Sequence, residues 1–232
     1  MTTLAAAGAI CHHWDMTQTV SPHGRIIHSP DCMAEGADWL ATRHDRFKVA
    51  LEATGPLPLR RRSDGFSALL SSIVSQQVSV ASANAIWGRL QAAGLTEDPL
   101  ALAARSDDDL RACGLSRQKI RYARGVAEAG LDWQALRDLP DEAVIETLVA
   151  LPGIGRWTAE IYAMFALGRA DVFAPGDLAL QESARLLFQM ETRPKEKELR
   201  TMAEDWSPWR AVAARLLWAY YHVAKDREGI RE

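Results

Sequence analysis

Residues 151–155 read Leu151-Pro152-Gly153-Ile154-Gly155, a sequence that indicates a tight turn between two helices. Pro152 ends the helix before it, because its ring has no N–H and clashes with the preceding turn. Gly153 and Gly155 allow a sharp turn and a close approach of another backbone. The helix that follows begins with unpaired N–H groups, which form a natural seat for a phosphate. Taken by itself, this segment also fits an ordinary corner between two helices.

The segment after the second helix ends in an aspartate, Asp171-Val172-Phe173-Ala174-Pro175-Gly176-Asp177. We expect Asp177 to open a further helix, where backbone N–H groups and the helix dipole stabilise a carboxylate. Such an aspartate can be only an N-cap, or it can also act in catalysis. The two interpretations are compatible, because a capped carboxylate is held rigidly with its charge available.

Helical spacing recurs along most of the chain. Apolar residues three and four positions apart form one helical face in Phe66-Leu69-Leu70-Ile73 and again in Val212-Leu216-Tyr220-Val223. A further helix is predicted from Ser79 to Ala93, with Gly94 as its stop. Ser106 and Ser116 are candidate N-caps, and Gly114 is a second candidate stop. The turn is flanked by predicted helices at 141–150 and 156–167. No segment alternates with a period of two, so the sequence predicts an all-α protein of about ten short helices.

The first part of the chain differs from the rest. Residues 1–35 show little periodicity and contain two Ser-Pro pairs, so we interpret them as a mobile N-terminal tail. Cys11-His12-His13 could in principle bind a metal, although a tail is the simpler interpretation. Met33 is an alternative start of the chain. A secretory signal is not expected, because the first residues lack a basic region.

The composition is typical of a soluble globular protein, with 232 residues of which 48% are hydrophobic and 25% are charged. This length suffices for one sizeable core or two small domains. No apolar segment approaches the roughly 20 residues of a membrane helix, so no membrane partner is expected. The net charge of −3 disfavours indiscriminate binding to nucleic acid but allows a local basic face. The three scattered cysteines argue against a disulfide framework and fit a reducing cytoplasm.

The turn, the second helix and the aspartate at position 177 together resemble the helix–hairpin–helix, Gly/Pro-Asp (HhH-GPD) superfamily of DNA glycosylases. Three further segments resemble its alkylbase branch, DNA-3-methyladenine glycosylase II, in the same order along the chain. They are Ser75-Gln76-Gln77-Val78-Ser79-Val80-Ala81, Leu115-Ser116-Arg117-Gln118-Lys119-Ile120, and Pro208-Trp209-Arg210 with Leu216-Leu217-Trp218. Four motifs in the right order make the resemblance specific.

The resemblance implies two helical subdomains with a DNA-binding cleft between them. The terminal subdomain would comprise residues 36–62 and 178–232, and the central subdomain residues 63–177 with the helix–hairpin–helix at 141–167. Long bacterial forms add an N-terminal β-rich domain, for which this chain has too few residues before Phe66. A base-flipping enzyme of this kind is expected to act as a monomer.

The resemblance also implies base excision repair, in which the N-glycosidic bond of an alkylated purine is hydrolysed to leave an abasic site. A purine of the 3-methyladenine or 7-methylguanine type is already cationic, so the enzyme need not protonate it. Asp177 would stabilise the oxocarbenium-like sugar, or it would orient or deprotonate the attacking water. Both roles for Asp177 stay open.

The damaged base of double-stranded DNA must be flipped out of the stack to reach the aspartate. By resemblance, Trp157, Trp218 and Tyr162 line the base-binding pocket, where aromatic faces would attract a cationic base. A purely structural role in the core is the alternative for Trp218. Relatives that also cut the strand carry a lysine where this chain has Trp157, so we expect a monofunctional glycosylase. Ile161 and Leu178 stand where the long bacterial form has aromatic residues.

By the same resemblance, the backbone N–H groups of Gly153 and Gly155 bind a DNA phosphate, with Arg156 beside them. Gln76 and Gln77 belong to a loop that faces the minor groove. Gln77 would fill the gap left by the flipped base, or it is simply a polar residue at a helix start.

Two arginine clusters and the hairpin carbonyls complete the candidate contacts. Arg117, Arg121 and Arg124 form a strip that either follows the DNA backbone or is merely solvated, and the Arg60-Arg61-Arg62 run has the same two interpretations. No cofactor is expected. The family's hairpin often holds a monovalent cation, Na⁺ or K⁺, which here would bind the carbonyl oxygens of Val149, Leu151 and Gly153.

Three other functions compete with this interpretation. A related glycosylase for a deaminated or oxidised base would share the fold, but Trp157 and the lack of a cysteine cluster argue against it. A non-catalytic helix–hairpin–helix module that only binds DNA would have no need of Asp177. A general helical interaction protein would leave the four ordered motifs unexplained.

Overall fold

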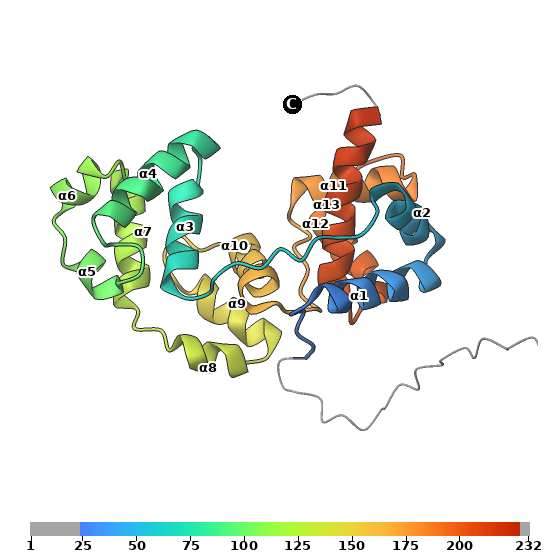
Figure 1. Ribbon diagram of the computed structural model, residues 1–232, viewed down its shortest axis with the longest axis horizontal. Helices are drawn as coiled ribbons and strands as arrows, with labels where there is room; N and C mark the ends of the chain where they lie inside the picture. The colour runs from blue at the N-terminus through green and yellow to red at the C-terminus, as the bar shows by residue number, and fades with distance from the viewer. Residues whose placement is uncertain (1–23, 228–232) are drawn as a thin grey trace, which may run out of the picture.

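The computed structural model describes residues 24–227, which form an all-α fold as predicted (Figure 1). The α-helices of this part are α1 (Pro30–Arg43), α2 (Asp45–Thr54), α3 (Phe66–Ser75), α4 (Val80–Ala92), α5 (Pro99–Ala103), α6 (Asp107–Ala112), α7 (Arg117–Glu128), α8 (Trp133–Asp138), α9 (Asp141–Val149), α10 (Arg156–Tyr162), α11 (Leu178–Phe188), α12 (Glu196–Met202) and α13 (Arg210–Arg227). A π-helical turn, Ala163–Leu167, follows α10, and a 3₁₀ turn, Ala203–Trp206, follows α12. Among these described helices, none has the length and apolar character needed to cross a membrane.

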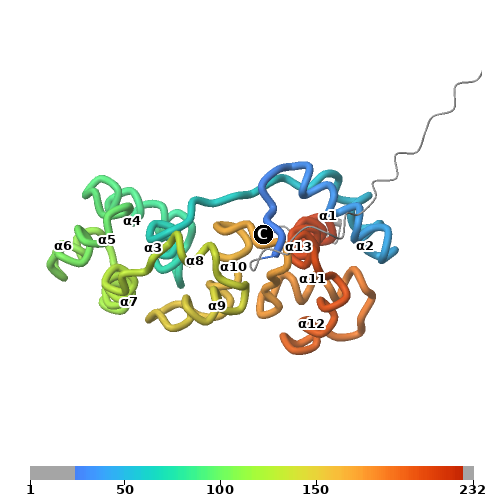
Figure 2. Tube along the Cα trace, turned by 90° about the horizontal axis from the view of Figure 1, so that it is seen from below, coloured from blue at the N-terminus to red at the C-terminus, as the bar shows by residue number. Residues whose placement is uncertain are grey.

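The helices form two groups that lie next to each other along the length of the molecule (Figures 1 and 2). Helices α3 to α10 make up the central subdomain, in which α7 packs against α3 and α5. Helices α1, α2, α11, α12 and α13 make up the terminal subdomain, in which α13 packs against α1, α2 and α11. Residues 55–65 connect α2 to α3 as an extended strap along one edge (Figure 2). The terminal subdomain is thus built from both ends of the chain.

The predicted tail over residues 1–35 is wrong from residue 24 onward. Ser29 is the N-cap of α1, and its hydroxyl accepts a hydrogen bond from a backbone N–H in the first turn at 3.2 Å. Pro30 follows at the first helical position, where its missing N–H costs nothing. Met33 is buried in the core. The candidate metal-binding run Cys11-His12-His13 lies outside the described residues.

The predicted helix starts and stops in the central subdomain are confirmed. The hydroxyls of Ser79, Ser106 and Ser116 each accept a hydrogen bond from a backbone N–H three residues on. Gly94 and Gly114 follow helix ends with positive φ angles of 71° and 98°. These elements form from local signals alone, because a cap needs only the residues beside it.

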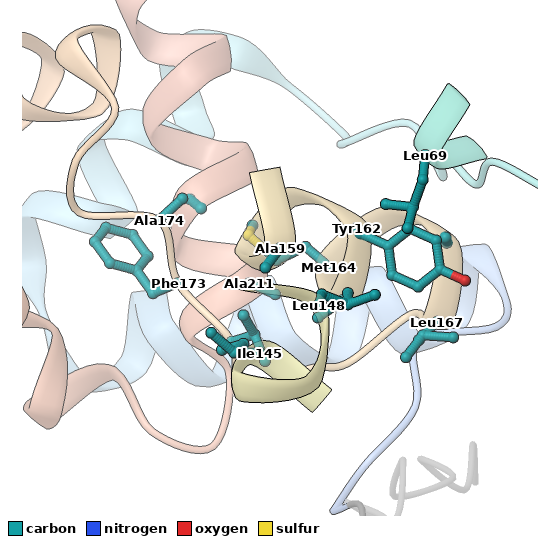
Figure 3. Packing of buried hydrophobic residues seen from close by; sticks show 14 of the residues in the cluster. Leu69, Ile145, Leu148, Ala159, Tyr162, Met164, Leu167, Phe173, Ala174 and Ala211 are labelled. Atoms are coloured by element: carbon teal, nitrogen blue, oxygen red, sulfur yellow. The ribbon is translucent and has the colours of Figure 1, made fainter. Parts of the chain in front are cut away.

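The two subdomains meet in an apolar contact between α9, α10 and α13 (Figure 3). Leu148 and Ala159 of the central subdomain and Ala211 of the terminal subdomain are fully buried there. The small alanine side chains let the backbones approach, and the Ala211 N–H donates to the carbonyl oxygen of Ala170 at 2.9 Å. Apolar packing and this backbone hydrogen bond join the start of α13 to the segment that follows the π-turn.

The predicted helix at 156–167 is α-helical only as far as Tyr162 and continues as the π-turn. This π-turn ends the helix, and the last carbonyls of a helix have no helical partners. Its carbonyl oxygens accept hydrogen bonds from outside the helix, namely Met164 from Arg215 Nη2 (2.8 Å), Phe165 from the Arg62 backbone N–H (3.0 Å) and Ala166 from Arg61 Nη2 (3.0 Å). Two members of the 60–62 arginine run therefore tie the strap to the π-turn and are not a merely solvated cluster.

Candidate active site

Asp177 is the N-cap of α11, as predicted. Its Oδ1 atom accepts hydrogen bonds from the backbone N–H groups of Ala179 at 2.9 Å and Leu180 at 3.0 Å. The turn before it is fixed by the Gln181 side chain, whose Nε2 donates to the carbonyl oxygen of Pro175 at 2.8 Å. The first turn of α11 thus holds one negative charge in a defined place.

Two tryptophans from different subdomains donate to the same carboxylate. Trp157, in the first turn of α10, donates its Nε1–H to Asp177 Oδ2 at 3.1 Å. Trp218, on α13, donates its Nε1–H to Asp177 Oδ1 at 3.2 Å. The sequence predicted these tryptophans as pocket walls but gave no signal for hydrogen bonds to the aspartate. Four N–H donors therefore orient the carboxylate, and Oδ2 accepts only one of them.

The aromatic surface beside the carboxylate is open. The Trp157 side chain is 48% exposed although its N–H is bound, so one face of the indole remains available to a ligand. Leu178, which follows the aspartate, is 62% exposed on the first turn of α11. Trp218 is half-buried. The site combines a fixed negative charge with exposed apolar surface, which suits a flat, positively charged ligand.

Tyr162 does not belong to this site, and its prediction as a pocket residue is corrected. Its side chain is only 5% exposed, and its hydroxyl accepts a hydrogen bond from the Gly65 N–H at 2.8 Å. Burial raises the pKa of Tyr162 to about 12. The ring packs in the central core near Leu69 and Trp133 (Figure 3).

The hairpin between α9 and α10 has the predicted turn, but its two glycines differ. Gly153 has a φ of +82°, and a Cβ atom built there would lie 2.3 Å from the Tyr122 ring. Gly155 is the N-cap of α10 with a φ of −85°, and a Cβ atom there would meet nothing within 4 Å. Only Gly153 is required by the fold of the hairpin itself.

The loop between α3 and α4 contacts this hairpin. Gln76 donates its Nε2–H to the carbonyl oxygen of Gly153 at 3.0 Å, so it braces the hairpin. Gln77 is exposed and has a φ of +55°, which places it at the tip of the turn. The structure therefore separates the two predicted DNA contacts, since Gln76 is engaged within the protein and Gln77 is presented to solvent.

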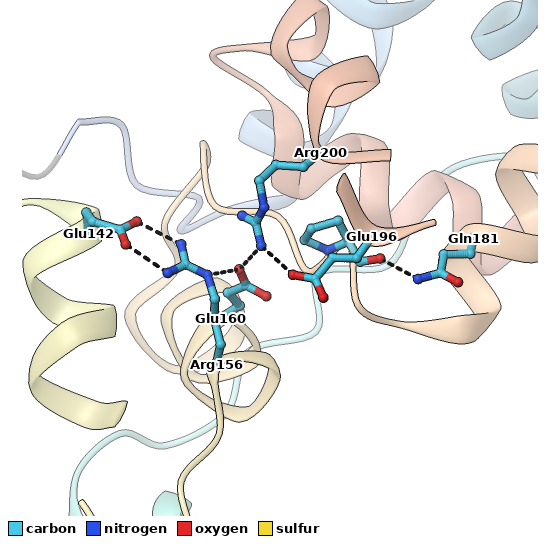
Figure 4. A network of polar contacts seen from close by, with 7 residues as sticks. Glu142, Arg156, Glu160, Gln181, Glu196 and Arg200 are labelled. Atoms are coloured by element: carbon cyan, nitrogen blue, oxygen red, sulfur yellow. Dashed lines mark hydrogen bonds and ion pairs between the residues drawn. The ribbon is translucent and has the colours of Figure 1, made fainter. Parts of the chain in front are cut away.

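Arg156, which was predicted to assist phosphate binding, is engaged by two carboxylates within the protein. Its Nη1 and Nη2 atoms each donate to a carboxylate oxygen of Glu142 at 2.9 Å, and its Nε donates to Glu160 at 3.1 Å (Figure 4). The Arg156 guanidinium holds the pKa of the Glu142 carboxyl below its usual value. Both faces of the guanidinium fork are thus satisfied by carboxylates of α9 and α10.

Glu160 links this cluster to the terminal subdomain. It is 2% exposed, and its Oε1 also accepts a hydrogen bond from Arg200 of α12 at 3.1 Å (Figure 4). Burial raises the pKa of Glu160, while its two arginine partners oppose that rise. Arg200 in turn pairs with Glu196 at 3.0 Å. This ion network crosses from α9 through α10 to α12, so it fixes the helix that carries Trp157.

The predicted basic strip on α7 is reduced to two residues. Arg117 and Arg121 are exposed, and they line a surface cavity of about 410 Å³ that also includes Pro152 of the hairpin. Arg124 instead pairs with Asp107 and donates to the carbonyl oxygen of Ala103. Arg117 therefore remains a candidate for phosphate contact, whereas Arg124 is a structural residue.

The hairpin carbonyls offer the donor type that a monovalent cation prefers, since they are neutral oxygens. The carbonyl oxygen of Leu151 accepts the Ile154 N–H at 3.2 Å, and that of Gly153 accepts Gln76 Nε2. Each carbonyl oxygen has a second lone pair, so these contacts are compatible with the predicted cation. Within residues 24–227 no cluster of three or more His, Cys, Asp or Glu side chains could hold a metal ion.

Asp141 at the start of α9 predicts a pH dependence of stability. Burial, together with the nearby Asp171 charge, raises the pKa of Asp141 to about 6. Arg169 Nη1 lies 3.4 Å from Oδ1, but this oxygen has no hydrogen bond within the described residues, so burial dominates. Because the folded state binds the proton more tightly, this contribution to stability is present below about pH 4 and is lost as the pH rises through about 6.

The free energy of unfolding of the wild type, minus that of Asp141→Asn, should therefore fall by up to about 3 kcal/mol between pH 4 and pH 7.5. Urea unfolding of both proteins across this range measures the difference directly. Taking the difference cancels the titration of all other groups. A difference that stays constant with pH would show that the Asp141 carboxyl titrates normally.

Fold and site together define a helix–hairpin–helix protein with a fixed carboxylate beside exposed aromatic surface. Residues 70–208 match the family model for the HhH-GPD superfamily base excision DNA repair protein, which is more than half of the chain. The chain therefore belongs to the HhH-GPD superfamily of base excision DNA repair proteins.

Several relatives of this family are similar over most of their length. The alkylbase DNA glycosidase-like protein mag2 of Schizosaccharomyces pombe is 26% identical over 77% of this chain and 89% of its own. The crystal structure of a DNA-3-methyladenine glycosidase from Bacillus halodurans superimposes with a TM-score of 0.75 at 36% identity, covering 87% of this chain and 94% of the other. The 3-methyladenine DNA glycosylase Mag1 of Schizosaccharomyces pombe, in complex with abasic DNA, superimposes with a TM-score of 0.70 at 28% identity, covering 79% and 95%.

Proposed function

We propose that this protein is a base excision repair enzyme that removes alkylated purines from double-stranded DNA and leaves an abasic site. The observation that carries the proposal is the Asp177 carboxylate, oriented by four N–H donors next to the exposed face of Trp157. A module that only binds DNA has no use for such a carboxylate. The relatives named as 3-methyladenine glycosylases support the same substrate class.

The geometry divides the carboxylate into two functional halves. Oδ1 accepts three N–H donors and is saturated, so it anchors the group. Among the described residues, Oδ2 accepts only the Trp157 N–H and can therefore face the sugar or the attacking water. As the bond to the cationic base breaks, positive charge grows on the sugar and is stabilised by a charge that needs no reorganisation. We infer that Asp177 acts mainly by this electrostatic effect.

The base would lie against the tryptophan face after leaving the helix. Trp157 presents an exposed indole, and an electron-poor alkylated purine is attracted to such a face. Leu178, the residue after the aspartate, offers exposed apolar surface where a second aromatic ring would restrict the base. We infer a base site that is more open than a fully aromatic pocket.

The hairpin and the α3–α4 loop form the DNA-facing surface in this proposal. Backbone N–H groups at Gly153 and Gly155 would bind phosphate on one strand, with Arg117 as a side-chain contact. Gln77, exposed at its turn, would enter the gap left by the flipped base. A monovalent cation on the hairpin carbonyls would add positive charge near the same phosphate. One protein molecule, a monomer, would suffice for this arrangement.

Release of damaged bases from methylated DNA tests the function. The protein is incubated with DNA treated with a methylating agent, and the released bases are identified by mass spectrometry. We expect 3-methyladenine or 7-methylguanine in the supernatant with the wild type and almost none with Asp177→Asn. Release of only deaminated or oxidised bases from suitably damaged DNA would assign the enzyme to another lesion, and no release from any substrate would contradict the proposal.

A second experiment tests for strand cleavage. Trp157 stands where relatives that cut the strand carry a lysine, and an indole cannot form a Schiff base with the sugar. We therefore expect intact abasic DNA and no covalent adduct when borohydride is added during base release. A known bifunctional glycosylase in parallel serves as the positive control. A trapped protein–DNA adduct of this chain would show lyase activity and overturn the monofunctional assignment.

A further inference from the structure

Trp218 contacts a second ring as well as the carboxylate. Its indole packs against Phe165 of the π-turn, with ring centroids 5.7 Å apart and planes tilted by 36°. The direction of its N–H toward Asp177 therefore depends on where the Phe165 ring lies. Phe165 is half-buried and lies in the π-turn that follows α10, the helix that carries Trp157.

Arg215 is buried beneath this stack. It lies one turn before Trp218 on α13, and its Cζ atom is 4.4 Å from the centroid of the Phe165 ring. Its Nη1 and Nη2 atoms donate to the carbonyl oxygens of Ala211 at 2.9 Å and Met164 at 2.8 Å. Its Nε is buried and has no hydrogen-bond partner within the described residues.

Burying the Arg215 guanidinium costs free energy, because the group leaves water. Arg215 is 6% exposed, and burial together with the neighbouring Arg61 charge lowers its pKa to about 10. An apolar side chain of similar volume would avoid the cost of burying a charge. It could not, however, donate to the Met164 carbonyl, which lies in the last turn of the helix and has no helical partner there. The arginine is therefore tied to the shape of the π-turn, and the π-turn carries Phe165.

We propose that Arg215 and Phe165 are positioning residues for base release at Asp177. The buried guanidinium fixes the Phe165 ring, the ring fixes the Trp218 indole, and the indole N–H fixes the carboxylate oxygen. This inference rests on the proposed glycosylase function, since it assigns both residues to that reaction. Both act through Trp218 and touch neither the sugar nor the base.

The strap of residues 55–65 also contacts the Phe165 ring and the π-turn that carries it. The Arg62 guanidinium lies 5.7 Å from the Phe165 centroid, and its backbone N–H donates to the Phe165 carbonyl at 3.0 Å. Arg61 donates to the carbonyls of Ala166 and Ile27, which ties the π-turn to the start of the terminal subdomain. The position of the Phe165 ring thus depends on the helix that carries it, on α13 and on the strap. It therefore requires both subdomains to be correctly packed.

The first test compares Arg215→Met with a matched buried arginine. Arg215→Met fills the same space without the hydrogen bonds, and Arg169→Met makes the same change at a buried arginine that donates to the carbonyls of Arg137 and Leu139. We expect Arg215→Met to slow single-turnover base release by about tenfold to a hundredfold, with affinity for abasic-site DNA within about twofold of the wild type. Arg169→Met should lose stability but keep its rate. Equal slowing by both variants would reduce Arg215 to a stability residue.

A double-mutant cycle separates positioning from general structural damage. Trp218→Phe keeps a ring on Phe165 but removes the N–H that binds Asp177. If Arg215 acts through that N–H, adding Arg215→Met to Trp218→Phe should slow the reaction by no more than about twofold further. Fully additive effects would overturn the proposal. Phe165→Leu, which leaves the buried charge in place, repeats the cycle should Arg215→Met not fold, and the same non-additivity is expected.

A spectroscopic measurement is independent of activity. The indole N–H resonance of Trp218 is assigned in a ¹H–¹⁵N spectrum by its loss in Trp218→Phe. It should shift toward the position of an unbound indole in Arg215→Met or Phe165→Leu and stay unchanged in Arg169→Met. If the wild type releases no base but the Trp218 resonance shifts in Arg215→Met or Phe165→Leu, the proposed function fails. The structural coupling of Arg215 and Phe165 to Trp218 then still stands. If the wild type releases base and neither rate nor resonance responds, the coupling alone is overturned.

Discussion

Asp177→Asn is expected to slow single-turnover base release by about two to three orders of magnitude, the usual effect of removing one fixed electrostatic group from a transition state. The asparagine oxygen can still accept the N–H groups of Ala179 and Leu180, so α11 keeps its cap. What is lost is the negative charge opposite the sugar. In addition, the amide nitrogen would face the Trp157 N–H, and two donors repel each other.

Asp132→Asn provides the matched control. Asp132 caps α8 with the same geometry, since its Oδ1 accepts the N–H groups of Gln134 at 3.0 Å and Ala135 at 2.9 Å. Among the described residues, no indole N–H donates to Asp132. The substitution therefore measures the effect of asparagine on a helix cap without the loss of the catalytic charge. Asp132→Asn should keep the wild-type rate, and thermal unfolding should show both variants folded. A rate for Asp177→Asn within about tenfold of the wild type would remove Asp177 from the chemistry.

The second large effect is expected at Gly153. Alanine at a φ of +82° costs about 1–2 kcal/mol, and its Cβ would displace the Tyr122 ring, so Gly153→Ala should lower the free energy of unfolding by about 3 kcal/mol. The distorted hairpin should also lose affinity for abasic-site DNA by about tenfold or more, because its N–H groups no longer point together. Urea unfolding measures the first effect and fluorescence anisotropy the second.

Gly155→Ala is the control within the same turn. Its φ of −85° suits any residue and its Cβ would meet open space, so stability should change by less than about 1 kcal/mol. A loss of DNA affinity without a loss of stability would show that the DNA backbone approaches Gly155 closely. If both alanine variants were equally stable, the argument from the φ angle at Gly153 would be wrong.

These two glycines also show how far sequence reasoning reaches. The turn, its flanking helices and the serine caps depend on neighbouring residues, so the sequence predicted them. Which glycine is obligatory depends on Tyr122, a residue that lies on another helix. The same limit applies to Arg156, whose basic side chain suggested phosphate but whose partner Glu142 comes from the helix before the turn.

Two further errors have simple physical causes. Tyr162 follows Ile161 directly, and one step along a helix rotates a side chain by about 100°, so Tyr162 points into the core. The Ser29-Pro30 pair was interpreted as loop, although a proline at the first helical position is as typical of a helix start. The two indole bonds to Asp177 had no sequence signal, because they join three separate helices.

The division of the terminal subdomain between the two ends of the chain has a consequence for synthesis. Helices α1 and α2 leave the ribosome early, yet their packing partner α13 is made after all the other described helices. The central helices α3 to α10 emerge as one continuous segment and can pack on one another before α13 exists. Trp218 can reach Asp177 only once α13 has been made and has docked. The nascent chain therefore acquires its complete carboxylate site late, after most of the polypeptide has already folded.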